Sequence, residues 1–75
     1  MPKLDPVLTA LGRNVRRQRD AKTFTQEKLT EKSGLDPTYM SDIKRGLRNP
    51  GIKNVAKLAR APGLSTAELC KGVDA

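Results

Sequence analysis

Residues 24–50 read FTQEKLTEKSGLDPTYMSDIKRGLRNP, and this stretch contains two helix starts separated by one tight turn. Each start has a side chain that can cap a helix, preceded by an apolar residue and followed four positions later by another, the pattern of a hydrophobic staple. The two staples are Phe24-Thr25 with Leu29 and Leu35-Asp36 with Met40. Gly34 can adopt the left-handed conformation that ends a helix. The stretch therefore predicts helices over 26–33 and 37–45, joined by a short turn.

Two short helices joined in this way have the layout of a helix-turn-helix. In the second helix, Met40, Ile43 and Leu47 follow helical spacing and are expected to point into the core. The opposite face then carries Pro37, Thr38, Ser41, Asp42 and Arg45. Base edges in the DNA major groove are read by small or forked polar side chains near the start of a helix. We therefore interpret residues 26–45 as the unit that enters the major groove.

Three side chains on that face have the chemistry to read bases. Thr38 could contact a thymine methyl group or a base acceptor, and Ser41 could bond either a donor or an acceptor. An ionised Asp42 could accept a hydrogen bond from a cytosine amino group. Its negative charge would also oppose phosphate binding, so a solvated surface acid is the alternative interpretation of Asp42.

The rest of the chain is also helical in pattern, and no segment alternates as a strand would. Asp5-Pro6 marks one further start, and Leu64-Ser65 with Glu68 and Leu69 marks another. Helical apolar spacing runs through Leu8, Leu11 and Val15, and through Ile52, Val55, Ala56 and Ala59. We expect helices over 6–21, 52–61 and 66–71, which gives an all-α, five-helix fold in one domain, 1–75. Residues 1–4 and 72–75 are expected to be loose ends.

The charge balance favours a polyanionic partner. Fifteen Lys and Arg against eight Asp and Glu give a net charge of +7 and a pI near 10.1. Such a surface attracts nucleic acid, although an excess of charge also serves solubility alone. The predicted first helix carries Arg13, Arg16, Arg17 and Arg19, and we expect Arg16 or Arg17 to approach the DNA backbone while the others remain solvated.

Composition argues against several other classes. The chain has no histidine and one cysteine, so neither a typical zinc site nor an internal disulfide can form. We expect no metal, no cofactor and no small-molecule ligand, and Cys70 is interpreted as a small buried hydrophobe without a further role. Without paired carboxylates or a glycine-rich phosphate loop, an enzyme is not expected. The short apolar stretches predict neither a membrane span nor a secretion signal, and therefore a cytoplasmic protein.

The run from Phe24 to Pro50 resembles the core motif of the XRE-type, phage-repressor-like helix-turn-helix family. The shared features are a helix that starts with glutamine, a glycine turn, a Tyr-apolar-Ser segment, a basic-Gly pair and Arg-Asn-Pro. A weaker similarity covers the first helix and KNVAKLARAPGLSTAEL, residues 53–69. The chain's size resembles that of restriction–modification controller proteins and small phage-type repressors.

The resemblance implies a five-helix domain that binds double-stranded operator DNA as a homodimer. It implies that Gln26 contacts a phosphate and that bases are read from Asp36, Pro37, Thr38 and Asp42. Arg48 and Asn49 match residues that meet the backbone or the minor groove, and we place Arg45 with the backbone contacts. Tyr39 could offer its hydroxyl group to a phosphate, or its ring could simply pack.

Four positions depart from the family pattern. Many relatives pair a helix-1 arginine with a helix-3 glutamate, whereas this chain has Arg19 and Lys44, so that ion pair cannot form. Thr30 replaces a usual alanine at the contact of the second and third helices, and Pro62 replaces a usual leucine and shortens the fourth helix. Gly51 stands where relatives place a Ser or Thr cap, so the fourth helix is expected to start less firmly.

We therefore predict a sequence-specific transcriptional regulator that acts as a homodimer on a palindromic operator. The alternative is an adaptor or toxin-neutralising module of the same fold, which a flat, apolar exposed face would favour. The dimer contact is expected on the fourth and fifth helices, because one small domain is not expected to bury Leu64, Leu69 and Val73 fully.

Overall fold

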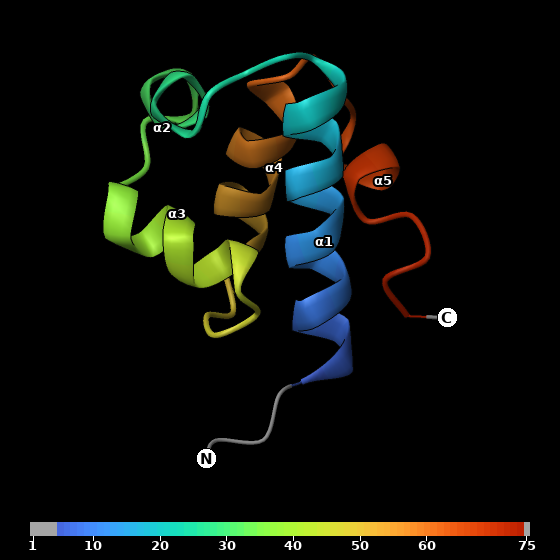
Figure 1. Ribbon diagram of the computed structural model, residues 1–75. Coiled ribbons are helices and arrows are strands. Elements are labelled where there is room, and N and C mark those ends of the chain that lie inside the picture. Colours follow the sequence, from blue (N-terminus) through green and yellow to red (C-terminus); the bar gives the residue numbers. More distant parts are fainter. Residues whose placement is uncertain (1–4, 75) are drawn as a thin grey trace.

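Five α-helices follow one another along residues 5–74, the part of the chain that the computed structural model describes (Figure 1). They are α1 (Pro6–Ala21), α2 (Gln26–Ser33), α3 (Pro37–Lys44), α4 (Ile52–Arg60) and α5 (Thr66–Leu69). The predicted all-α fold is confirmed. Each helix begins at the residue that the sequence indicated and ends at most two residues earlier than predicted. None of the five helices between residues 5 and 74 has the length and apolar character needed to span a bilayer.

Side-chain caps explain where these helices begin. The side chains of Asp5, Thr25, Asp36 and Ser65 accept hydrogen bonds from backbone N–H groups in the first turn of α1, α2, α3 and α5. These bonds satisfy donors that have no partner within the helix. Gly51, at the start of α4, provides no such bond. That departure from the family pattern is therefore confirmed.

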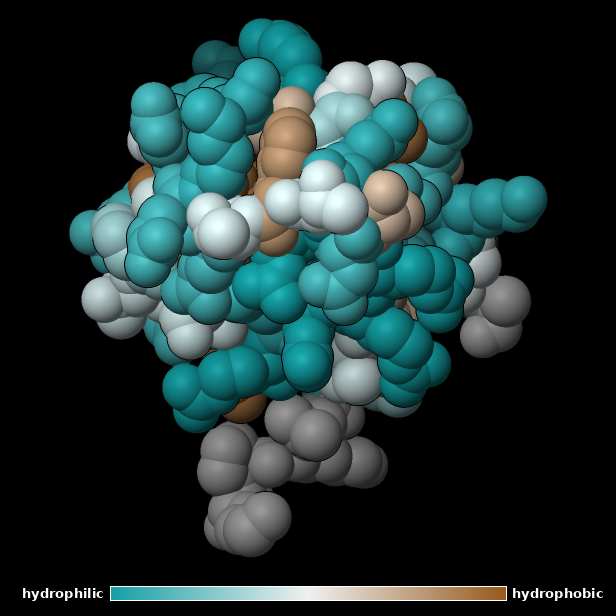
Figure 2. Space-filling view, turned by 45° about the horizontal axis from the view of Figure 1, so that its top comes forward, coloured by the Kyte–Doolittle hydropathy of each residue, from teal (hydrophilic) through white to brown (hydrophobic). Residues whose placement is uncertain are grey.

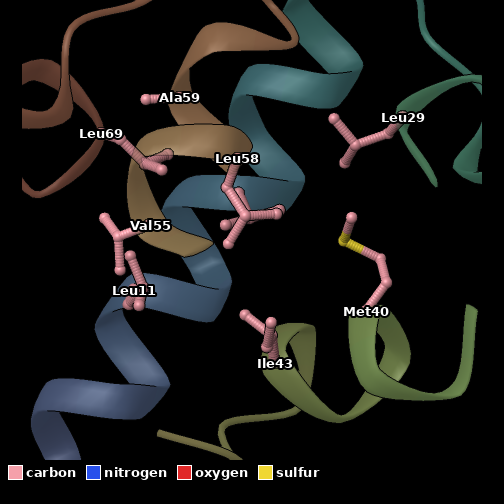
Figure 3. Packing of buried hydrophobic residues seen from close by; sticks show 9 residues of the cluster. Leu11, Leu29, Met40, Ile43, Val55, Leu58, Ala59 and Leu69 are labelled. Carbon is pink, nitrogen blue, oxygen red and sulfur yellow. The ribbon is translucent and has the colours of Figure 1, made fainter. Parts of the chain in front are cut away.

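The core lies where all five helices meet (Figure 3). Its fully buried side chains are Leu29 of α2, Met40 and Ile43 of α3, Leu58 of α4 and Leu69 of α5. Both staples of the 24–50 stretch contribute to it, because Phe24 and Leu35 pack against the cluster from outside. The staples therefore fix the angle at which α2 and α3 enter the core.

The buried stripe of α4 differs from the predicted one. Val55 and Ala59 are buried as expected, but the third buried residue is Leu58, and Ile52 is 72% exposed. Ile52 is the first residue of α4, so its side chain projects beyond the end of the core rather than into it. The predicted helical spacing of α4 was correct, but the buried face is rotated by part of a turn from the predicted one.

The C-terminal segment is more firmly packed than predicted. Leu69 is only 1% exposed, so the expectation that one domain would leave it unburied was wrong. The amide group of Asn14 donates hydrogen bonds to the carbonyl oxygens of Leu69 (2.8 Å) and Lys71 (3.0 Å), which holds α5 against α1. Val73 packs against the core, and so does half-buried Cys70. The expected loose end at 72–75 is therefore wrong at Val73, while residues 1–4 and 75 lie outside the described part of the chain.

Candidate nucleic-acid interface

The turn between α2 and α3 sets the geometry of the predicted reading unit. Gly34 ends α2 with a φ of +73°, a left-handed conformation that glycine adopts without steric cost. Two residues later, Oδ2 of Asp36 accepts hydrogen bonds from the backbone N–H groups of Thr38 (2.9 Å) and Tyr39 (3.2 Å). These two devices define where α2 stops and α3 starts, so the direction of α3 is fixed by local chemistry.

The outward face of α3 is polar, as the sequence indicated. Pro37, Thr38 and Arg45 are exposed, and Ser41 and Asp42 are half-buried beside them. Met40 and Ile43 point into the core from the opposite side (Figure 3).

The inward orientation predicted for Leu47 was wrong, because this side chain is 43% exposed. Helix α3 ends at Lys44, and Gly46 has a φ of +73°. The N–H group of Leu47 then bonds back to the carbonyl oxygen of Asp42 at 2.9 Å. Helical spacing therefore no longer applies at position 47.

Asp36 caps α3, and this structural role limits its predicted base contact. Because Oδ2 already accepts two backbone hydrogen bonds, a base contact from this side chain would have to use Oδ1. The carboxylate is exposed and sits at the start of α3, where its negative charge also interacts favourably with the helix dipole.

A cluster of four side chains forms around Tyr39 and Asp42 of α3, with Arg48 from the following loop and Asn54 from α4. The guanidinium group of Arg48 is 3.4 Å from the carboxylate of Asp42 and stacks 5.1 Å from the centre of the Tyr39 ring. The Tyr39 hydroxyl oxygen accepts a hydrogen bond from the amide of Asn54 at 3.0 Å. Its own proton is therefore left to donate, so the ring packs while the hydroxyl group could still bond a phosphate. No periodicity in the sequence reveals this cluster, because its members come from a helix, a loop and a second helix.

The Gln26 side chain, at the first position of α2, bonds to α3. Its Oε1 accepts a hydrogen bond from Nζ of Lys44. A lysine ammonium can only donate, so the amide oxygen must face Lys44 and the amide –NH₂ group points elsewhere. That group is a donor of the kind that a phosphate oxygen accepts.

Positive side chains of α1 and α3 surround this bond. Arg16, Arg19 and Arg45 line one hollow together with Gln26, Ser41 and Lys44. A neighbouring hollow is lined by Arg13 and Arg17 and contains one carboxylate, Asp20. Burial, and then the charges of Arg19 and Arg16, lower the pKa of Lys44, while Asp20 opposes the shift.

The structure thus divides the predicted contacts into two groups. Arg16, Gln26, Ser41 and Arg45 gather at the hollow between α1, α2 and α3. Arg48 lies instead beside Asp42 and Tyr39, and Asn49 follows it as an exposed residue. Within residues 5–74, no three His, Cys, Asp or Glu side chains come together as metal ligands would.

The hydrophilic character extends across the face that Figure 2 displays. Apolar residues appear on it only in small, separate areas among polar and charged ones. This face therefore offers no broad apolar surface of the kind that an adaptor module would use.

Comparison with known proteins places most of the chain in one family. A helix-turn-helix family model matches residues 15–69. Control protein C.BamHI of Bacillus amyloliquefaciens is 41% identical over 59 residues, which cover 77% of this chain and 73% of that protein.

Solved structures give the same picture. The restriction-modification controller protein C.AhdI from Aeromonas hydrophila superposes with a TM-score of 0.79 and 40% identity, covering 83% of this chain and 94% of the other. The controller protein C.Esp1396I, crystallised as a tetramer in complex with its natural 35 base-pair operator, gives a TM-score of 0.77 and 34% identity. The superposition covers 81% of this chain and 80% of the C.Esp1396I chain.

Proposed function

This chain belongs to the XRE-type helix-turn-helix family, and from this premise we propose that it is a sequence-specific transcriptional regulator of double-stranded DNA. It acts in the cytoplasm, without catalytic activity, as a homodimer on a palindromic operator. The observation that carries the proposal is the face of α3. An exposed polar helix, rigidly oriented by the caps at Gly34 and Asp36, is flanked on one side by the cationic hollow and on the other by Arg48.

The arrangement separates base reading from backbone binding. Pro37, Thr38, Ser41 and Asp42 occupy the α3 face and are assigned to base edges, together with the free oxygen of Asp36. The cations on either side, Arg16, Arg17, Arg45 and Arg48, are assigned with Gln26, Tyr39 and Asn49 to the sugar–phosphate backbone. Backbone contacts orient a protein on the duplex and supply most of its affinity, whereas the helix face supplies discrimination.

Two-fold symmetry follows from the size of the domain and from its similarity to controller proteins. C.Esp1396I binds its operator as a tetramer, and a repeated half-site would let two weak reading helices act together. We assign the contact between the two copies to α4 and α5, with exposed Ile52 in place of buried Leu69 among the apolar residues that support it.

Selection of bound sequences from a random duplex library tests the proposal. We expect enrichment of an inverted repeat whose half-sites are separated by about one helical turn, about 10 base pairs from centre to centre. Binding with no sequence preference, or no binding to duplex DNA at all, would refute it and favour the adaptor function.

A further inference from the structure

The bond between Lys44 and Gln26 has charged surroundings, and two of the cations there, Lys44 and Arg19, have no role in the proposed function. Four cations line the hollow around it, Arg16 and Arg19 from α1 with Lys44 and Arg45 from the end of α3. No carboxylate from residues 5–74 lines it with them. Asp20, outside this hollow, partly offsets them through its 3.3 Å pair with Arg19. Like charges held this close are unfavourable unless an anion joins them.

Arg19 adds a second observation. Its Nε atom is buried and has no hydrogen-bond partner among residues 5–74. A buried donor without a partner is costly and is rare in folded proteins. The neighbouring Lys44 cannot satisfy it, because an ammonium group has no acceptor. Among the described residues, Arg19 Nε thus has no acceptor, and the side chains that line the hollow include no carboxylate.

The position of the hollow indicates which anion would reach it. Ser41 and Arg45, which lie on or beside the outward face of α3, also line the hollow. Gln26 brings the first turn of α2, and the start of a helix favours an anion. DNA that lies against α3 would thus place its backbone at the mouth of the hollow.

We infer that Lys44, with Arg19 and Arg16, forms a binding site for one phosphodiester group of the DNA backbone, and that Lys44 also turns the Gln26 amide toward that phosphate. The site rests on the proposed function, since it is occupied only when DNA lies against α3. The phosphate oxygens accept hydrogen bonds from the Lys44 ammonium, from the guanidinium groups of Arg16 and Arg19 and from the –NH₂ group of Gln26. The negative charge of the phosphate relieves the repulsion between the three cations.

Substitution of Lys44 separates this site from a purely structural role. Lys44→Gln retains a donor for Gln26 but removes the charge, and Lys44→Glu places a carboxylate beside Arg19. We expect Lys44→Gln to weaken binding to a random-sequence duplex about ten-fold at about 0.1 M salt, and to reduce the slope of log affinity against log salt by about one. Lys44→Arg, which keeps the charge, should remain within about three-fold of the wild type.

Lys44→Glu gives the sharpest contrast, because it should raise the melting temperature of the free protein while binding DNA less tightly than Lys44→Gln. Lys32→Glu, at an exposed position near the end of α2, is the matched control for the change in net charge and should weaken binding much less. A structural Lys44 would produce the opposite result, with both Lys44 variants less stable and their salt slopes unchanged, and would overturn the inference.

Two further comparisons distinguish failure of the proposed function from failure of the phosphate site. If the wild type does not bind duplex DNA, the proposed function itself fails, whereas wild-type binding with unaltered Lys44 variants overturns only the phosphate site. Melting in inorganic phosphate and in chloride of equal ionic strength tests for a free anion. We expect no difference, and a stabilisation by phosphate that Lys44→Gln abolishes would show that the hollow holds the free ion instead.

Discussion

Gly12 of α1 lies directly against the backbone carbonyl oxygen of Lys44 at the end of α3. A Cβ atom at position 12 would be 2.5 Å from that oxygen, closer than side-chain carbons approach backbone atoms in folded proteins. Because the obstacle is backbone, it cannot move aside as a side chain could. The absence of a side chain at position 12 therefore sets the distance between α1, which carries the arginines, and α3, the helix proposed to read DNA.

Gly12→Ala should destabilise the fold by about 1–3 kcal/mol, because α1 and α3 must separate to admit the methyl group. Urea unfolding measures this free energy. Gly51→Ser is the matched control, because no atom lies within 4 Å of the added Cβ and a serine N-cap should stabilise α4 by a few tenths of a kcal/mol. Equal stability of Gly12→Ala and the wild type would mean that the two helices are farther apart than described.

Much of this fold could be predicted because its helix boundaries are determined by neighbouring residues in the sequence. Caps at Thr25, Asp36 and Ser65 and glycine stops need only neighbouring residues to act, so the sequence alone locates them. The long-range contacts behaved differently. Gly12 is required because the backbone of α3 lies opposite it, and no neighbouring residue indicates this contact. The hydrogen-bond partners of Asn14 are 55 and 57 residues away, so they too could not be located from nearby sequence.

The same distinction applies to the candidate site. The outward face of α3 follows from helical spacing, so Thr38 and Arg45 are exposed as predicted. The extrapolation failed at Leu47, where the spacing ended with the helix. The pairing of Arg48 with Asp42 could not be predicted, since a loop residue has no periodic relation to the helix it contacts.

Lys44 should make stability depend on pH in a defined direction. Its pKa in the folded protein lies below the ordinary 10.5, chiefly through burial and then through Arg19 and Arg16. Between the folded-state pKa and 10.5 the unfolded chain binds more protons, so this residue's contribution to stability rises with pH. Below the folded-state pKa the charged form is populated in both states, and its cost is fully present.

Lys44→Gln should therefore be more stable than the wild type at about pH 7, and the advantage should shrink as the pH approaches 10.5. Urea melts of the two proteins, compared at each pH, cancel the pH-dependent contributions that both proteins share. An advantage that grows with pH would contradict the assigned shift.

Ile52 should contribute to the dimer contact. It is the most exposed large apolar side chain of the described residues and opens α4. Ile52→Asp should weaken dimerisation at least ten-fold in sedimentation without DNA, since a charge would be desolvated at the contact. Because the side chain lies outside the core, the melting temperature of the monomer should barely change. A wild type that stays monomeric at micromolar concentration yet binds palindromic DNA tightly would refute the assignment.

Thr38 and Arg16 should have different effects on DNA binding. Thr38→Ala removes a side chain from the exposed α3 face and should reduce preference at particular base pairs by about 1–3 kcal/mol, with little change in salt dependence. Arg16→Ala should weaken specific and random duplexes alike and lower the salt slope by about one. Parallel titrations of both duplexes at several salt concentrations measure the two effects. Full sequence preference in Thr38→Ala would remove that residue from the reading face.

Asp42 and Arg48 should show whether their contact changes how Asp42 reads DNA. Asp42→Ala should lower discrimination at individual base pairs, and it should also raise affinity for random DNA because a negative charge is lost. Arg48→Ala should weaken both kinds of duplex, since its guanidinium group is assigned to the backbone.

The double variant decides between direct reading and positioning. The carboxylate lies 3.4 Å from the Arg48 guanidinium group, so the two single effects are not expected to add fully. If Asp42 reads a base itself, Asp42→Ala still lowers discrimination when Arg48 is already alanine. If the loss of discrimination occurs only in the presence of Arg48, the carboxylate acts by holding the arginine, and the base contact assigned to Asp42 is wrong. Competition binding with single-base operator variants, repeated in both backgrounds, measures the difference.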